Sequence, residues 1–143
     1  MVLAGVDFPP DIRVEKEATA LCRAGHSVTI VCSQLRSTPL ADQWESCTVT
    51  RLPRLTTLSR AVNKLGMLLT FNDRQWNHSL DAMAATRQVD IFHVHDLPMA
   101  GTTLRIAKRH RLPVILDLHE NWSAALKYYR LGGKAVYSKI VAP

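Results

Sequence analysis

The sequence feature that most constrains the fold is a regular alternation of short apolar segments with longer amphipathic segments. Residues 2–6 form an apolar run that ends at an Asp-Phe-Pro-Pro sequence, which predicts a buried strand followed by a loop. Asp11 can cap a helix whose apolar residues recur at helical spacing, and Gly25 stands where such a helix would end. Residues 27–32 are apolar and β-branched, so the start of the chain predicts a βαβ unit.

The alternation continues to about residue 119. Further strands are predicted at residues 47–52, 90–95 and 113–119, and further helices at residues 73–87 and 96–111. One more helix is predicted from an apolar stripe of Leu58, Val62, Leu65 and Leu69. This order predicts an α/β fold with a Rossmann-like, doubly wound parallel sheet, in a single domain over residues 1–143. No sixth strand is evident after residue 119, so we expect the sheet to be truncated before its last strands.

Composition excludes several classes of protein. Hydrophobic residues make up 47% and charged residues 21% of the chain, as in folded globular domains. No apolar run approaches the ~20 residues of a membrane-spanning helix, and the chain starts without a basic leader, so we expect a cytoplasmic location. Cys22, Cys32 and Cys47 are too few and too widely spaced for a disulfide scaffold or a zinc ribbon. We expect them to be buried thiols.

The net charge of +6 is unevenly distributed, because residues 101–143 hold eight Lys/Arg and only two Asp/Glu. This distribution favours an anionic partner, such as a nucleotide or a phospholipid head group. The sequence contains no G-x-G-x-x-G and no G-x-x-x-x-G-K-[ST] motif, which argues against a dinucleotide site or a P-loop. It also lacks an aromatic-interleaved strand and a recognition-helix motif, so no nucleic-acid partner is expected.

Candidate site residues follow the predicted strands, because open parallel sheets bind ligands at the carboxyl ends of their strands. His93 and His95 are two residues apart, so both imidazoles lie on one face of a strand, and Asp96 comes next. These three residues could form a metal site, although the sequence places no third ligand firmly. Alternatively, His93 packs inside the sheet and Asp96 caps the following helix. His95 is the better candidate for ligand binding, since it lies nearer the strand end.

A second group follows the strand predicted at residues 113–119. Asp117 and His119 share a face there, and a histidine at a strand end could contact a sugar hydroxyl while a carboxylate orients it. Glu120 and Asn121 come next and could bind substrate. The sequence around Glu120 is no H-E-x-x-H zinc motif, because serine stands in the last position. The alternative is that His119 has a structural role.

Arg13 and Lys16 lie in the first turns of the helix after the first strand. A helix amino terminus attracts phosphate, and these cations would strengthen that attraction. The alternative is an exposed salt-bridge face shared with Glu15 and Glu17.

The segment 51–76 combines cations with surplus apolar residues. Its five basic residues, against the single acid Asp73, are Arg51, Arg54, Arg60, Lys64 and Arg74. Such a segment can dock on an anionic bilayer surface. Alternatively, it contains an ordinary core helix with a solvated basic edge.

Three segments of the chain resemble family 4 glycosyltransferases. Residues 9–18 and 24–29 are similar to that family's first helix and second strand, in the branch with a D-x-R-V-x-K-E motif. Residues 89–96 and 116–120 are similar to its fourth- and fifth-strand signatures. The resemblance implies one half of a GT-B enzyme, in which two Rossmann-like domains face a cleft.

The resemblance further implies a hexosyl-type transferase in polysaccharide biosynthesis. The enzyme would move sugar from a nucleotide-sugar to a glycan or lipid-linked acceptor, with retention of configuration and without a metal or other cofactor. It places His119 in the cleft as the catalytic residue and Arg13 near the donor phosphates. Paired glycines typical of the first loop are replaced here by Asp11-Ile12-Arg13, which weakens the case for close backbone approach to phosphate.

The nucleotide-sugar-binding C-terminal domain is expected to be absent from this chain, so we predict little transfer by these residues alone. A peripheral location at the inner membrane face is the accompanying expectation. The rival interpretation is a free-standing, non-catalytic module that binds a sugar phosphate or nucleotide.

Overall fold

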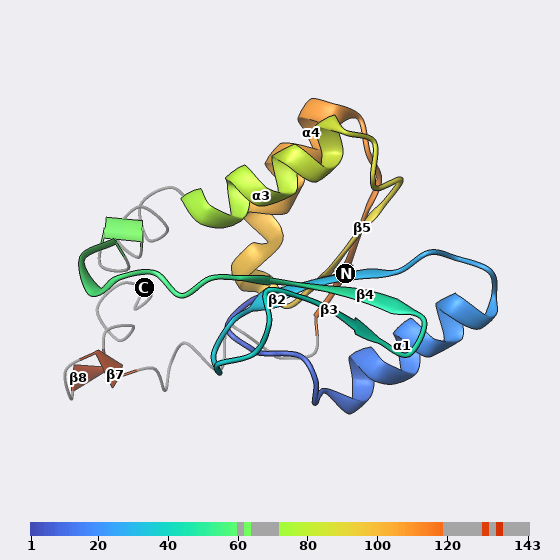
Figure 1. Cartoon of the computed structure of the whole chain (residues 1–143). Coiled ribbons are helices and arrows are strands. Elements are labelled where there is room, and N and C mark those ends of the chain that lie inside the picture. Colours follow the sequence, from blue (N-terminus) through green and yellow to red (C-terminus); the bar gives the residue numbers. More distant parts are fainter. Residues whose placement is uncertain (60–61, 64–71, 119–129, 132–133, 136–143) are drawn as a thin grey trace.

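The computed structural model describes residues 1–59, 62–63, 72–118, 130–131 and 134–135. Six strands form one sheet in the order β3-β4-β2-β1-β5-β6 (Figure 1). All neighbours in it are parallel except β3 and β4, which are antiparallel. The strands are β1 (Val2–Leu3), β2 (Thr29–Ser33), β3 (Ala41–Trp44), β4 (Cys47–Leu52), β5 (Phe92–His95) and β6 (Val114–Asp117). The predicted Rossmann-like α/β fold is therefore confirmed.

The described residues include the helices α1 (Ile12–Arg23), α3 (Arg74–Ala85) and α4 (Ala100–His110), helical residues at 57–59 and 62–63, and a short 3-10 turn, η1 (Leu97–Met99), before α4. A separate antiparallel pair joins β7 (Arg130–Leu131) to β8 (Lys134–Ala135). Strand β3 and this pair were not predicted from the sequence. The helix predicted from the stripe at Leu58 lies largely outside the described residues, and Leu58 and Val62 are both exposed.

Local signals define the ends of α1. The Asp11 carboxylate accepts hydrogen bonds from the backbone N–H groups of Arg13 and Val14, at 3.1 and 3.4 Å. Glu15 Oε1 accepts in return from the Asp11 N–H at 3.1 Å, so three otherwise unpaired donors are satisfied at this terminus. At the other end Gly25 takes a φ of +90°, a conformation in which a side chain would be strained. The predicted start and end of this helix are thus confirmed.

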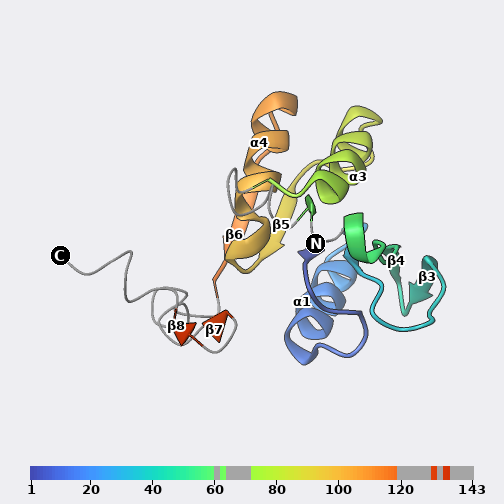
Figure 2. The same ribbon diagram turned by 90° about the vertical axis from the view of Figure 1, so that its left-hand side faces the viewer.

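The sheet is covered on both faces. Helices α3 and α4 lie above it and α1 lies below it in Figure 1, and Figure 2 shows the same layers from the side. One core cluster joins α3 and α4 to the first face and includes Val2, Val31, Leu80, Val94 and Ile106. The other joins α1 to the second face and includes Leu3, Val14, Ala18, Ile30 and Val49. Successive strand residues therefore alternate between two buried faces, as doubly wound sheets require.

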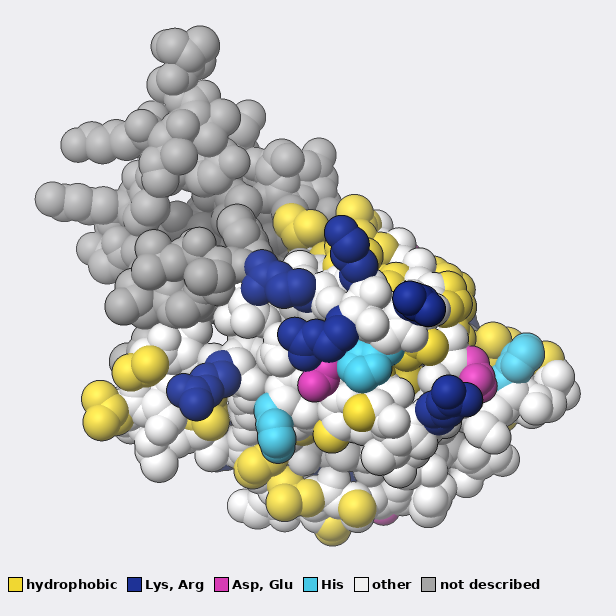
Figure 3. Space-filling model, turned by 90° about the horizontal axis from the view of Figure 1, so that it is seen from above, with side chains coloured by type: hydrophobic (Ala, Val, Ile, Leu, Met, Phe, Trp, Pro, Cys, Tyr) yellow, Lys and Arg dark blue, Asp and Glu magenta, His cyan; other side chains and the backbone are white. Residues whose placement is uncertain are grey.

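The outer surface of α3 and α4 is strongly basic, as the gathering of dark blue side chains in Figure 3 shows. Its exposed cations on these helices and the turns after them are Arg74, Arg87, Arg105, Lys108, Arg109 and Arg111. Asp81 is the acid on α3, and it pairs with Arg109 Nη1 at 2.9 Å and with His110 Nε2 at 2.8 Å. The sequence-based expectation of a basic region in the last third of the chain is met here by α4.

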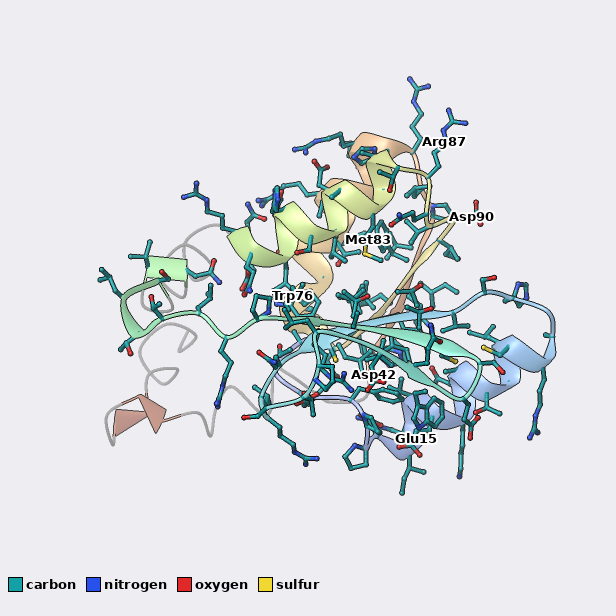
Figure 4. The ribbon with its side chains drawn as sticks, viewed as in Figure 1. Glu15, Asp42, Trp76, Met83, Arg87 and Asp90 are labelled. Atoms are coloured by element: carbon teal, nitrogen blue, oxygen red, sulfur yellow. The ribbon has the colours of Figure 1, made fainter. Side chains whose placement is uncertain are left out.

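The inner side of α3 carries the apolar residues that hold it to the sheet. Trp76 and Met83 lie on that side of the helix in Figure 4, and Trp76 is only 4% exposed. Asp73 caps α3 by accepting from the Trp76 N–H at 3.1 Å. The Asp73 N–H donates in turn to the buried Thr102 hydroxyl of α4 at 2.9 Å, so the cap also fixes α3 against α4.

Arg51 corrects one prediction. It was expected to contribute to a basic surface over residues 51–76, but its side chain is only 2% exposed. The guanidinium is enclosed at the carboxyl end of β4, where its Nε donates to Asp7 Oδ1 at 2.9 Å and its Nη2 donates to the Phe8 carbonyl at 2.6 Å. It therefore cannot bind an external anion.

Candidate functional site

The candidate site lies at the carboxyl edge of the sheet, between β1 and β5. These two strands are adjacent, yet the chain leaves β1 toward β2 on one side and leaves β5 toward β6 on the other. Ligands of doubly wound sheets bind at this reversal, because the connecting segments diverge and open a crevice there. The segments that follow β1, β5 and β6 are therefore the ones that could contact a ligand.

The loop after β1 is firmly held. The Gly5 N–H donates to Ser33 Oγ at 3.1 Å, and Gly5 has a φ of +76°. Asp7 Oδ2 accepts from the N–H groups of Leu35 and Arg36, at 3.1 and 3.0 Å, which ties the loop to the segment after β2. Burial alone would raise the pKa of the Asp7 carboxyl, but these hydrogen bonds and the Arg51 guanidinium outweigh it and lower the pKa. Asp7 is thus an ionised structural residue that fixes the loop.

Arg13 is an exposed cation near this edge. It stands in the first turn of α1, and its side chain is 52% exposed. Its Nη2 lies 3.5 Å from Asp11 Oδ2. Burial alone would raise the pKa of the Asp11 carboxyl, but the hydrogen bonds from Arg13 and from the Val14 N–H outweigh it and lower the pKa. The helix amino terminus and the guanidinium both favour negative charge here.

Lys16 follows Arg13 one turn further along α1. It lines a shallow hollow beside Trp44 and Glu45, which belong to β3 and to the turn between β3 and β4. That turn comes directly before β4. Because β4 is parallel to β2, its start lies at the amino edge of the sheet, and so does the turn. Lys16 therefore lines this hollow, one turn along α1 from Arg13, and its assignment to the site stays a prediction.

His93 and His95 share one face of β5, as predicted. Their ring centroids lie 4.4 Å apart with an interplanar angle of 32°. Phe92 and Val94 alternate with them and pack into the core beneath α3 and α4, so both imidazoles face the α1 side. The side chain of His95 is 5% exposed and that of His93 is 18% exposed.

Two carboxylates from other elements meet these imidazoles. Glu17 comes from α1, and its Oε2 lies 3.9 Å from His93 Nε2 and 3.6 Å from His95 Nε2. Asp117 ends β6, and its Oδ2 lies 3.8 Å from His95 Nδ1. The sequence indicated Asp117 but gave Glu17 only as part of an exposed salt-bridge face. The one sequence feature that could have indicated Glu17 is its position next to Ala18, which with Val14 forms the buried side of α1.

Asp96 lies outside this group. It occupies the N-cap position of η1, but its side chain makes no capping hydrogen bond there. Its backbone instead takes a φ of +68°, which is unusual for a residue other than glycine, and its N–H donates to the Asp117 carbonyl at 2.9 Å. This bond links the ends of β5 and β6 at the candidate edge.

The remaining predicted site residues, His119, Glu120 and Asn121, lie outside the described residues. They directly follow Leu118, the last residue of the described range 72–118 and one residue beyond Asp117. Their assignment to the site stays a prediction.

Comparison with known families identifies the class to which this fold and edge belong. Residues 10–141 match the model of the glycosyl transferase 4-like domain. The chain therefore belongs to the glycosyl transferase 4-like family, and its fold is that of a GT-B amino-terminal domain. Searches of curated proteins and of solved structures gave no match. Across the described ranges, no helix combines the length and apolar character needed to cross a bilayer.

Proposed function

We propose that this domain forms the acceptor side of the sugar-transfer site of a retaining, hexosyl-type GT-B glycosyltransferase. The observation that supports the proposal most is the reversal of chain direction between β1 and β5, in a domain of this family, with Arg13 exposed beside it. The co-substrates would be a nucleotide-sugar and a glycan or lipid-linked acceptor of polysaccharide biosynthesis. The donor would be held by a second, C-terminal GT-B domain.

In this proposal the residues after β6 contact the sugars. His119 would touch the transferred sugar or the acceptor, and Glu120 and Asn121 would accept or donate hydrogen bonds to sugar hydroxyls. Asp96 lies at the end of β5 and is partly exposed, so its carboxylate would bind an acceptor hydroxyl at the same edge. His95 is buried between Glu17 and Asp117. It would hold α1, β5 and β6 together beneath the site rather than contact the substrate.

Arg13 would act on the donor phosphates. The exposed guanidinium and the amino terminus of α1 provide a positive potential at the carboxyl edge, where a diphosphate would lie between the two domains. Lys16 has no part in this role because it lines the hollow beside Trp44. It offers a matched control on the same helix.

The test is transfer by the native protein from its source cell, whose intact mass is measured first. We expect a chain of two domains that transfers radiolabelled sugar to endogenous acceptor. His119→Ala should lower its turnover at least ~100-fold, the usual effect of losing one contact to the transition state, without lowering its melting temperature. Arg13→Ala should raise the KM for nucleotide-sugar, and Lys16→Ala should leave it unchanged.

Two results would contradict this function. Wild-type turnover by His119→Ala would remove His119 from the site. A native mass near 16.0 kDa, with a nucleotide-sugar that raises the melting temperature but is never transferred, would favour the free-standing binding module.

We also propose that the domain is peripheral to an anionic membrane, through the segment 51–76 without Arg51. Arg54 and Arg74 are exposed cations of that segment, which supports the proposal. Arg60 and Lys64 would complete the contact.

A further inference from the structure

Four side chains that are far apart in sequence converge between α1 and the ends of β5 and β6. One ligand atom from each of Glu17, His93, His95 and Asp117 lies within 4.8 Å of the ligand atoms of the other three. The four come from three different elements, so the tertiary fold and not local sequence brings them together. Their side chains are between 5% and 35% exposed, which leaves the cluster shielded but open to a small ion.

The separations in this cluster exceed those of hydrogen bonds. Both Nε2 atoms lie close to the same oxygen, Glu17 Oε2, at 3.6 Å for His95 and 3.9 Å for His93, whereas an N–H···O bond spans about 2.7–3.2 Å. In a tetrahedral zinc site with metal–ligand distances of about 2.0–2.1 Å, two ligand atoms lie about 3.3–3.4 Å apart. The observed separations are close to that value, and small side-chain rotations would close the difference.

The chemistry of the donors also selects a kind of ion. Two imidazoles and a carboxylate suit zinc and its neighbours in the first transition row, while magnesium and calcium prefer oxygen ligands alone. The spacing of His93 and His95 on a strand lets both rings reach one ion. Two carboxylates beside them balance a double positive charge.

We propose that Glu17 Oε2, His93 Nε2 and His95 Nε2 bind one divalent transition-metal ion, zinc being the best match. Ligation through Nε2 would leave the proton of His95 on Nδ1, and Asp117 Oδ2 lies 3.8 Å from that atom, so a small side-chain rotation would bring it into hydrogen-bond range. A carboxylate in that position orients the ring and raises the basicity of the ligating nitrogen. Three protein ligands leave a fourth position for water or another ligand, and the ion would join α1 to β5 beneath the candidate edge.

This site goes beyond the proposed sugar transfer and does not depend on it. It also differs from the sequence-based expectation, in which no metal was needed and a site at His93 and His95 would have been completed by Asp96. Glu17 and Asp117 take that place, because Glu17 reaches both imidazoles from α1 and Asp117 lies beside His95 at the end of β6.

The test is binding of zinc and cobalt to the purified chain after dialysis against a chelator. We expect calorimetry to give one equivalent of Zn²⁺ per chain, and Co²⁺ to give visible absorption without an intense sulfur charge-transfer band. Glu17→Gln and His93→Gln should weaken zinc binding at least ~100-fold, and Asp117→Asn by about 10–100-fold. The matched control His78→Gln, an exposed histidine on α3, should bind like wild type.

Folding of the variants is checked in the same samples. Zinc should raise the melting temperature of the wild type and of His78→Gln but not that of Glu17→Gln, which keeps the shape of the side chain. The proposal is overturned if the wild type shows no saturable zinc binding, or if Glu17→Gln binds as tightly as the wild type. A cobalt spectrum dominated by sulfur that disappears in Cys22→Ser would also overturn it, because the ion would then lie at the thiols of Cys22 and Cys47.

Discussion

Arg51 and Asp7 form an ion pair that is almost completely enclosed, with Nε and Oδ1 2.9 Å apart and side chains 2% and 3% exposed. The remaining nitrogens of the guanidinium are also satisfied, since Nη1 donates to the Pro39 carbonyl at 2.8 Å and Nη2 to the Phe8 carbonyl. The pair fastens the loop after β1 to β4 and to the segment after β2. It thus fixes the loop that leads into Arg13 at the candidate edge.

Replacing Arg51 should destabilise the domain severely. Arg51→Met leaves the Asp7 carboxylate buried without its cation and removes donors from two carbonyls, so we expect a loss of about 3–5 kcal/mol in the free energy of unfolding. Urea unfolding followed by circular dichroism measures it. Arg54→Met, three residues along the chain and exposed, should change the value by less than about 0.5 kcal/mol. A loss below about 1 kcal/mol for Arg51→Met would contradict the pair's structural role.

The lowered pKa of Asp7 predicts how this stabilisation depends on pH. A carboxyl with a folded-state pKa below its ordinary value, 3.8, stabilises the fold fully above that value. The stabilisation is then lost as pH falls through the lower, folded-state pKa. We therefore expect Asp7→Asn to lower the melting temperature most near neutral pH, and its difference from wild type to shrink below about pH 4.

A melting series from pH 7 to pH 3 measures that difference, with Asp42→Asn as the control. Asp42 lies 3.3 Å from Arg51 Nη1 but is 44% exposed, so its replacement should have a small effect throughout. A difference between Asp7→Asn and wild type that grows toward pH 3 would refute the assignment.

The sequence predicted the fold wherever an element carries its own pattern. The apolar, β-branched residues of β2 and the capped, periodic α1 are local signals, and both elements lie close to their predicted bounds. Strand β3 has the sequence Ala-Asp-Gln-Trp and is mostly exposed, so no apolar pattern marked it. It exists because β4 pairs with it in antiparallel register.

The site was predicted less completely because its contacts are long-range. Arg51 alternates with Thr50 and Leu52 on a strand and gave no sign of burial, since its partner Asp7 is 44 residues away. Glu17 likewise appeared to be a helix-surface acid, and only the tertiary fold, which places α1 on the histidine-bearing face of the sheet, brings it to His93 and His95. Pairings of this kind depend on strand order, which residue patterns within single elements do not specify.

The three cysteines should differ in reactivity. Burial raises the pKa of Cys32, and burial followed by the neighbouring Cys22 thiol raises the pKa of Cys47 to about 12. Because the thiolate is the nucleophile, iodoacetamide at pH 8 should modify Cys22 alone in the folded chain. Intact mass should show one added group, against three in denaturant. The Sγ atoms of Cys47 and Cys22 are only 3.1 Å apart, so burial and the raised pKa of Cys47, rather than position, distinguish the two thiols. Alkylation of Cys47 at the same rate as Cys22 would contradict this prediction.

Charge reversal in the segment 51–76 should weaken membrane binding more than the same change elsewhere. Each cation near an anionic bilayer contributes about 1 kcal/mol, so Arg54, Arg60 and Lys64 replaced together by Glu should lower affinity for phosphatidylserine-containing vesicles at least ~100-fold. Vesicle sedimentation at fixed salt measures the affinity. The matched control replaces Arg87, Lys108 and Arg111, exposed cations associated with the α3 and α4 face (Figure 3), by Glu. Equal losses in both variants would mean that net charge alone governs binding, and unchanged binding in the first would rule out the segment as a membrane contact.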